Sequence, residues 1–183
     1  MKIIKLLIII CLSISIPYYS TAQSFPEKEI IKKLGAQKID MDQGNGDGVF
    51  RAQSRKTKKW GMYQWMFEGT DVKKLIPMEF DSVRNFPFNG AFTAVYNNGK
   101  VGIYLCEWSY GEDAKQTVDC KYDDYRRINV EQDEYRSQLY LAVKKDGKWA
   151  WIDWLTGEVK SEFIYESTKA LPYPNFKQLN YPE

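Results

Sequence analysis

The stretch GKVGIY, Gly99 to Tyr104, decides the fold, because much of it occurs again elsewhere in the chain. It follows FTAVYNN, and a similar phrase, GKWAWI, spans residues 147–152 behind YLAVKKD. A looser version, KKWGMY, spans residues 58–63. Self-similarity at a period of about 20–50 residues is the sequence sign of a repeat architecture. The chain is therefore interpreted as a tandem repeat protein.

Each copy is predicted to begin as a β-hairpin. Residues 92–104 align without a gap over residues 140–152, and the dipeptides Asn98-Gly99 and Asp146-Gly147 fall at the same point. Both dipeptides suit a two-residue type I′ turn, in which both central residues need a positive φ. The first copy turns instead through the polar residues 55–57.

Each copy also has a second half, which ends in an aromatic residue followed by an acid. These acids are Asp81, Asp123 and Glu166. We expect each one to bond nearby backbone N–H groups and to close a turn. The alternative is a row of carboxylates that binds a cation or a ligand. With this half included, the unit has about three strands in roughly forty to fifty residues.

The pattern Lys-Trp-Gly-apolar-aromatic, followed by Leu-Ile-Pro and then aromatic-Asp-x-Val, resembles the WG repeat, a β-rich repeat common in bacterial proteins. The best match is the first copy, from Trp60-Gly61 to Val83, while the others have Val101-Gly102 and Trp149-Ala150 at the signature position. The likeness covers roughly residues 48–168. It implies tandem β units, and it implies no reaction because the family's activity is generally undefined.

The predicted fold is all-β, with three tandem antiparallel units in a meander or solenoid-like array. The units span about residues 48–83, 90–125 and 139–168. Alternate side chains of a strand share a face, so the large signature residues are expected in the core. The small residues beside them would let a neighbouring aromatic, or the backbone of the next unit, come close. Open and closed arrangements of the units both remain possible.

Residues 1–22 have the pattern of a secretory signal peptide, with basic residues, a short apolar run and cleavage near Ala22-Gln23. The alternative is an uncleaved anchor, and no other apolar run is long enough to span a membrane. Removing Lys2 and Lys5 leaves 24 of 26 basic residues against 24 acidic ones. A neutral chain is a poor nucleic-acid binder, because neutralising phosphates needs an excess of positive charge.

Two further segments flank the repeats. Residues 23–47 are predicted to hold a short helix at about 25–34, with Ser24 as its N-cap, Gly35 as its stop, and a role in covering the first repeat. The loop Asp40–Gly48 that follows is interpreted as a glycine-rich connector, with a calcium loop as the alternative. Residues 169–183 form a tail, predicted to cover the last repeat.

The residues that could carry chemistry are few. Cys106 and Cys120 remain after cleavage, and they are predicted to form a disulfide across a loop centred near Asp113. Histidine is absent from the chain, which excludes Ser-His-Asp and Cys-His catalysis and histidine-bound metals. No catalytic residue, metal ligand or cofactor is predicted.

The function predicted from these features is that of a secreted or periplasmic, non-catalytic interaction module. Its partner would be another protein or a component of the cell envelope. The candidate binding surface consists of aromatic residues expected to be exposed: Tyr63, Trp65, Tyr104 and Trp108. The alternative is a carbohydrate-binding protein or glycan-acting enzyme that uses exposed aromatic residues and carboxylates.

Overall fold

The computed structural model describes residues 24–41, 48–84, 92–105, 114–133 and 136–172. Their elements follow in chain order: α1 (Glu27–Leu34), β1 (Ala36–Met41), β2 (Val49–Ser54), β3 (Trp60–Trp65), β4 (Val72–Phe80), β5 (Ser82–Val83), β6 (Phe92–Asn97), β7 (Lys100–Leu105), β8 (Lys115–Tyr122), β9 (Asp124–Asp133), β10 (Arg136–Lys145), β11 (Lys148–Ile152) and the short 3₁₀ helix η1 (Thr168–Ala170).

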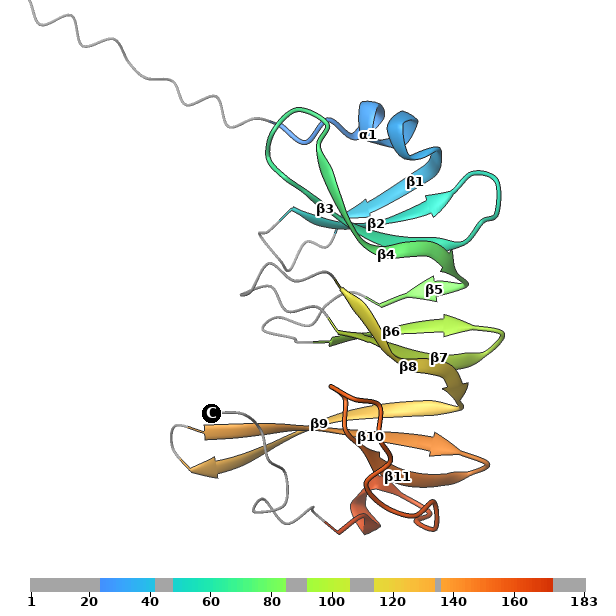
Figure 1. Cartoon of the computed structure of the whole chain (residues 1–183), viewed down its shortest axis with the longest axis vertical. Coiled ribbons are helices and arrows are strands. Elements are labelled where there is room, and N and C mark those ends of the chain that lie inside the picture. The colour runs from blue at the N-terminus through green and yellow to red at the C-terminus, as the bar shows by residue number, and fades with distance from the viewer. Residues whose placement is uncertain (1–23, 42–47, 85–91, 106–113, 134–135, 173–183) are drawn as a thin grey trace, which may run out of the picture.

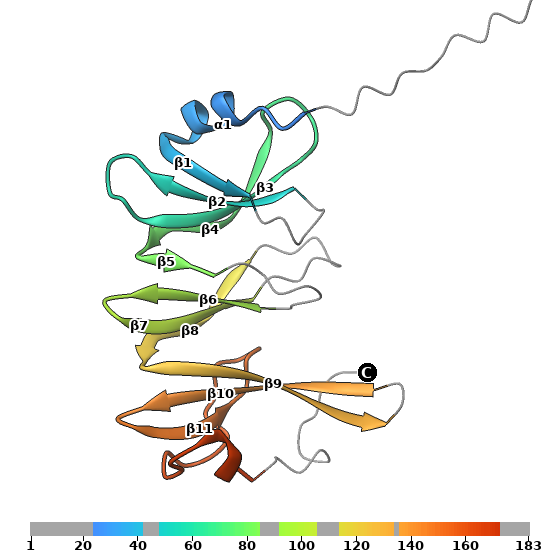
Figure 2. The same ribbon diagram turned by 180° about the vertical axis from the view of Figure 1, so that it is seen from behind.

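The strands form three antiparallel sheets that lie one above another along the long axis of the molecule (Figure 1). The first sheet has the order β1-β2-β3-β4, the second β5-β6-β7-β8 and the third β11-β10-β9. The view from behind shows the same stack, with α1 at one end and β11 toward the other (Figure 2). These findings confirm the predicted all-β array of three units with a helix at its N-terminal end.

The unit is larger than the sequence indicated. Strand β1 lies within residues 23–47, where only a helix and a connector were predicted, and β5 and β9 take the corresponding outer place in the second and third sheets. The first two sheets therefore have four strands each in the described part of the chain, rather than three. The third unit begins at Asp124, well before residue 139. Strands β9 and β10 pair along most of their length, so the segment between the second and third predicted units is part of the third sheet.

One residue separates each of the first two sheets from the next. Asp81 stands alone between β4 and β5, and Asp123 stands alone between β8 and β9. The backbone N–H of Asp81 donates to the carbonyl of Tyr96 at 2.8 Å, and that of Asp123 donates to the carbonyl of Lys144 at 2.8 Å. The chain thus leaves the last strand of one sheet and pairs with the next sheet within a single residue.

The small signature residues make room for a bulged strand of their own unit. The β3–β4 register shifts beside Gly61, and the β7–β8 register shifts beside Gly102. A Cβ built on Gly61 would lie 2.6 Å from the carbonyl oxygen of Ile76, and one on Gly102 would lie 2.6 Å from that of Val118. The prediction that the backbone of the next unit approaches here is therefore wrong.

In each unit the large signature residue pairs with the aromatic residue that comes directly before Asp81, Asp123 or Glu166. Trp60 pairs with Phe80, Val101 with Tyr122, and Trp149 with Tyr165. Val101 and Trp149 are buried, as predicted. Trp60 is only half-buried, because its ring lies at the edge of the packed region beneath the side chains of Lys38 and Arg51.

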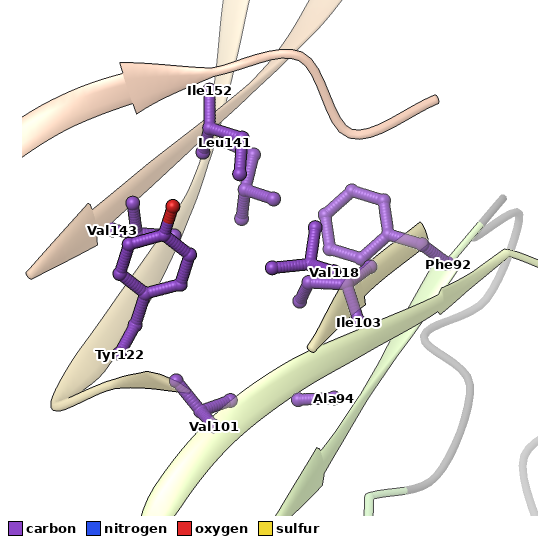
Figure 3. Close-up of a cluster of buried hydrophobic side chains, with 9 residues drawn as sticks. All are labelled: Phe92, Ala94, Val101, Ile103, Val118, Tyr122, Leu141, Val143 and Ile152. Carbon is purple, nitrogen blue, oxygen red and sulfur yellow. The ribbon is translucent and has the colours of Figure 1, made fainter. Parts of the chain in front are cut away.

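The core is continuous through the stack, because apolar side chains fill the space between successive sheets. The first interface contains Val49, Met62, Leu75, Ile76 and Phe80, packed on Val83, Val95 and Tyr104. The second places Phe92, Ala94, Val101, Ile103, Val118 and Tyr122 against Leu141, Val143 and Ile152 (Figure 3). Each interface removes apolar surface from water, and this burial is the main force that holds the units together.

Both ends of the stack are covered. Ile30 of α1 is fully buried against the outer face of the first sheet, and Gly35 ends the helix in the left-handed conformation at φ 62°. Pro26, not Ser24, is the N-cap, because a proline disfavours helical geometry in the residue before it. At the other end, Leu171 packs on Trp149. Residues 173–183 of the tail lie outside the described residues.

Among the described residues, no helix is both long enough and apolar enough to cross a membrane.

Candidate functional site

The aromatic residues predicted to form a binding surface are buried. Tyr63 is 7 % exposed, Trp65 is 5 % exposed and Tyr104 is 8 % exposed. Tyr63 and Trp65 face α1 from the first sheet, and the ring of Tyr104 meets that of Phe80 edge to face at 5.6 Å. The prediction of an exposed surface is therefore wrong for these three residues. Trp108 lies outside the described residues.

The predicted disulfide is not formed in the structure, where Cys120 is a free cysteine. Leu105 pairs with Lys115, which centres the loop between β7 and β8 before Asp113, and Cys120 lies further along β8 beside Gly102. At about 3.3 Å per residue, Cys120 is roughly 10 Å from the end of β7, whereas disulfide-bonded Cα atoms lie within about 7 Å. Cys106 itself is outside the described residues.

Asp81 and Asp123, which join successive sheets, are called the junction acids. The carboxylate of Asp81 accepts hydrogen bonds from two groups of the protein itself. One carboxylate oxygen accepts a hydrogen bond from Lys59 Nζ at 2.6 Å. The other accepts the backbone N–H of Asn98 at 2.7 Å. The hydrogen bond from Lys59, and then that from Asn98, lower the pKa of Asp81.

Asp123 repeats this arrangement in the second unit. Lys100 bonds one of its oxygens, and the backbone N–H of Asp146 donates to the other at 2.8 Å. The hydrogen bond from Lys100 is the largest cause of a lowered pKa at Asp123. In the third unit Lys148 pairs with Glu166. The contacts of Asp81 and Asp123 therefore agree with the expected turn-closing role and extend it across the unit boundary, whereas the contact of Glu166 is an ion pair within its own unit.

The calcium alternative concerned residues 40–48. Asp40 belongs to β1 and forms an ion pair with Arg51, so its carboxylate is already occupied. Residues 42–47 lie outside the described residues. The described residues contain no group of three acidic or cysteine side chains placed to hold a metal ion.

A cavity of about 720 Å³ lies where side chains from all three sheets meet. Arg51 comes from β2 in the first sheet, Arg84 follows β5 in the second, and Arg126 and Arg127 belong to β9 in the third. The full lining consists of Arg51, Arg84, Phe92, Thr93, Ala94, Tyr96, Asp124, Tyr125, Arg126 and Arg127. The cavity is therefore strongly basic, with aromatic rings between the basic groups.

Two of the four guanidinium groups are neutralised by carboxylates. Arg51 pairs with Asp40 and also donates to the carbonyl of Val83 at 3.0 Å. Arg126 pairs with Asp124 at 2.9 Å. In the described part of the chain no carboxylate forms an ion pair with Arg84 or Arg127. The cavity thus carries an excess of positive charge.

Arg84 and Arg127 are each placed on an aromatic ring. The guanidinium of Arg84 lies 5.9 Å from the ring centre of Tyr96, and a side-chain hydrogen bond with Tyr96 raises the pKa of Arg84. The guanidinium of Arg127 lies 5.5 Å from the ring centre of Phe92. Burial lowers the pKa of Arg127, and its NH1 atom is buried without a hydrogen-bond partner. Such an arrangement is costly unless an anion compensates it.

Sequence reasoning missed this cavity, although part of its signal was present. When the junction acids Asp81 and Asp123 are aligned, Arg84 and Arg126 fall at the same position of the repeat. An arginine recurring at a strand edge was therefore visible. Arg51 lies in a different strand, and only the stacking of the sheets brings it to the same place.

The fold and the cavity together define a class, that of a stacked β-repeat protein with a basic cavity spanning its units. Comparison of the chain with models of known protein families, with characterised proteins and with solved structures found no match. The resemblance to the WG repeat accordingly stays a prediction.

Proposed function

We propose that this chain is an exported, non-catalytic interaction module, and that the arginine cavity is its binding site. The observation that carries the proposal is the composition of the cavity, whose described lining has four arginines and a single acidic residue, Asp124. That carboxylate pairs with Arg126. The cavity has the groups needed to hold a ligand, because concave sites with a few convergent polar groups are the usual places of binding.

The same composition argues against catalysis by carboxylates. Hydrolysis of a glycosidic bond needs two acids about 5–10 Å apart on either side of the bond. Among the described residues the lining supplies only Asp124, and the chain has no histidine to replace a second acid. The cavity therefore fits binding better than turnover.

Export and the kind of partner rest on the sequence. Residues 1–22 carry the pattern of a cleavable signal peptide, which favours a secreted or periplasmic location. Formal neutrality after cleavage makes nucleic acid a poor partner. A protein or a component of the cell envelope is the partner that fits best.

Recognition of a glycan is the second candidate function. The cavity favours it with aromatic residues other than those that the sequence suggested. Tyr96 and Tyr125 are half-buried in the lining and present rings beside the arginines. They could take the role that was first assigned to Tyr63, Trp65 and Tyr104.

The test measures binding and turnover on the same material. Mature protein fixed on a biosensor is exposed to soluble cell-envelope extract, and the saturable response is compared between wild type, Arg84→Ala with Tyr96→Ala, and Arg55→Ala. Arg55 is an exposed arginine of the β2–β3 turn, outside the cavity lining. We expect the response to be lost only in the double variant, and the bound material to be chemically unchanged by mass spectrometry. Equal responses, or altered material, would contradict the proposal.

A further inference from the structure

We propose that the cavity binds an organic oxyanion, in which a phosphate or carboxylate group is attached to a body the size of a sugar ring. Arg84 and Arg127 would bind the oxyanion, and Tyr96 and Tyr125 would contact the body. The inference rests on the proposed function, since it names the ligand class of the same cavity.

The charge of the cavity indicates an anion. Arg84 and Arg127 have no carboxylate partner in the described residues, while the only carboxylate in the lining, Asp124, is held by Arg126 and by the backbone N–H of Tyr125 at 2.8 Å. A guanidinium presents its N–H groups in a plane that matches a carboxylate or a phosphate. An oxyanion is thus the ligand group that completes the pairing in this cavity.

The size and the aromatic walls indicate that the ligand is more than a simple ion. A volume of about 720 Å³ falls in the range of small-molecule sites, which is about 300–1,000 Å³. Phe92 is buried under Arg127, and the half-buried rings of Tyr96 and Tyr125 stand at the lining. An inorganic anion would leave most of this space and all of these rings unused.

Tyr125 is compatible with an anionic ligand at neutral pH. Burial raises the pKa of Tyr125 above its ordinary value of 10.0. The phenol therefore stays protonated, does not repel an anion, and has an O–H group that can donate a hydrogen bond.

The first experiment compares four probes by isothermal titration calorimetry with the mature protein at low ionic strength. The probes are inorganic phosphate, glucose 6-phosphate, glucuronate and glucose. We expect saturable binding of at least one anionic sugar, weaker binding of inorganic phosphate and none of glucose. The tighter of the two anionic sugars identifies the oxyanion as phosphate or carboxylate. Equal binding of glucose, or no binding of either anionic sugar at millimolar concentration, would overturn the inference.

The variants assign binding to the cavity. Arg84→Ala is expected to weaken the anionic sugar by about tenfold to a hundredfold, as for loss of a hydrogen bond to a charged group, whereas Arg55→Ala leaves the affinity unchanged. Equal affinities in these two variants would contradict the inference. Arg84 is exposed, so its substitution does not threaten the fold. If Arg127→Ala unfolds, Arg84→Ala and Tyr96→Ala still decide the question.

Two readouts separate this inference from the proposed function. If nuclear magnetic resonance shows that a bound sugar is converted, the non-catalytic proposal fails and the anion site stands. If no anionic sugar binds but envelope extract still gives a response that depends on the cavity, the anion inference fails and the binding module stands.

Discussion

The carboxylate of Asp123 accepts the backbone N–H of Asp146 at 2.8 Å, so the residue that ends the second unit also holds the hairpin turn of the third. Asp146 has φ 50° and the following Gly147 has φ 82°, as a type I′ turn requires. Asp81 makes the same bond to Asn98, at 2.7 Å. Asp81 and Asp123 are thus contacts between units, and we expect them to couple the folding of neighbouring sheets.

Replacing a junction acid should loosen this coupling. Asp123→Ala removes the partner of Lys100 and the acceptor for the turn N–H, so we expect a lower melting temperature and a lower urea midpoint than in wild type. Asp119→Ala is the matched control, because Asp119 is exposed on β8 and makes no side-chain hydrogen bond in the described structure. Equal loss in both variants would show that the junction bond contributes nothing specific.

The same acids should make stability depend on acid pH. Their pKa values are lowered in the folded chain from an ordinary 3.8, first by the lysine hydrogen bond. The unfolded chain therefore binds more protons as the pH falls, and the contribution of these acids is present above the unfolded pKa and lost through the folded pKa. Urea titrations between about pH 5 and pH 3 should show a smaller loss in an Asp81→Asn and Asp123→Asn double variant than in wild type. An identical acid profile would refute the assignment.

A glycine at the signature position is required by the bulge opposite it. A Cβ on Gly102 would lie 2.6 Å from the carbonyl oxygen of Val118 and 2.9 Å from the backbone nitrogen of Cys120. Gly102→Ala should therefore cost about 1–3 kcal/mol, the usual range for forcing atoms into a packed site. The control is Ala150→Gly at the same position of the third unit, which should cost about 0.5–1 kcal/mol. A smaller loss in Gly102→Ala than in the control would contradict the role of the bulge.

Local patterns were enough to predict the repeat, the turns and the helix. The Asn98-Gly99 and Asp146-Gly147 dipeptides have the positive φ values that their composition indicated, and Val101 and Trp149 are buried as expected. The extra strands were not predictable in this way. Strand β1 is mostly polar and β5 has two residues, so neither has a strand pattern of its own. Both exist because a neighbouring strand supplies their hydrogen bonds.

The strand register and the stacking of the sheets also could not be predicted from the sequence. The register that pairs Leu105 with Lys115 places Cys120 several residues from the end of β7, and no local pattern in the sequence fixes where β8 begins to pair with β7. Tyr63, Trp65 and Tyr104 were expected to be exposed, but α1 covers the outer face of the first sheet and both faces of the second sheet are covered. The cavity depends on side chains from three sheets, so its residues lie far apart in the sequence.

Because of the position of Cys120, we expect Cys106 and Cys120 to be free thiols, contrary to the disulfide that the sequence predicts. Ellman titration of the mature protein, unfolded without reductant, should find both thiols, and reductant should not change the melting temperature. Burial raises the pKa of Cys120, so it should react slowly in the folded protein. Cys120→Ser is the control and should leave a single thiol. Finding none in the unfolded wild type would show that a disulfide forms and that the β7–β8 register differs.

The last prediction tests the end of the stack. Trp149 is 6 % exposed and packs with Trp151 and Leu171 on the outer face of the third sheet. Trp149→Ala should lower the free energy of unfolding by about 3–5 kcal/mol, as for removal of a large buried ring. Trp60→Ala is the natural comparison, because Trp60 holds the same repeat position but is only half-buried, and it should cost clearly less. If the two losses in urea unfolding were equal, Leu171 would not be acting as a cap, and the outer face of the third sheet would be open to solvent.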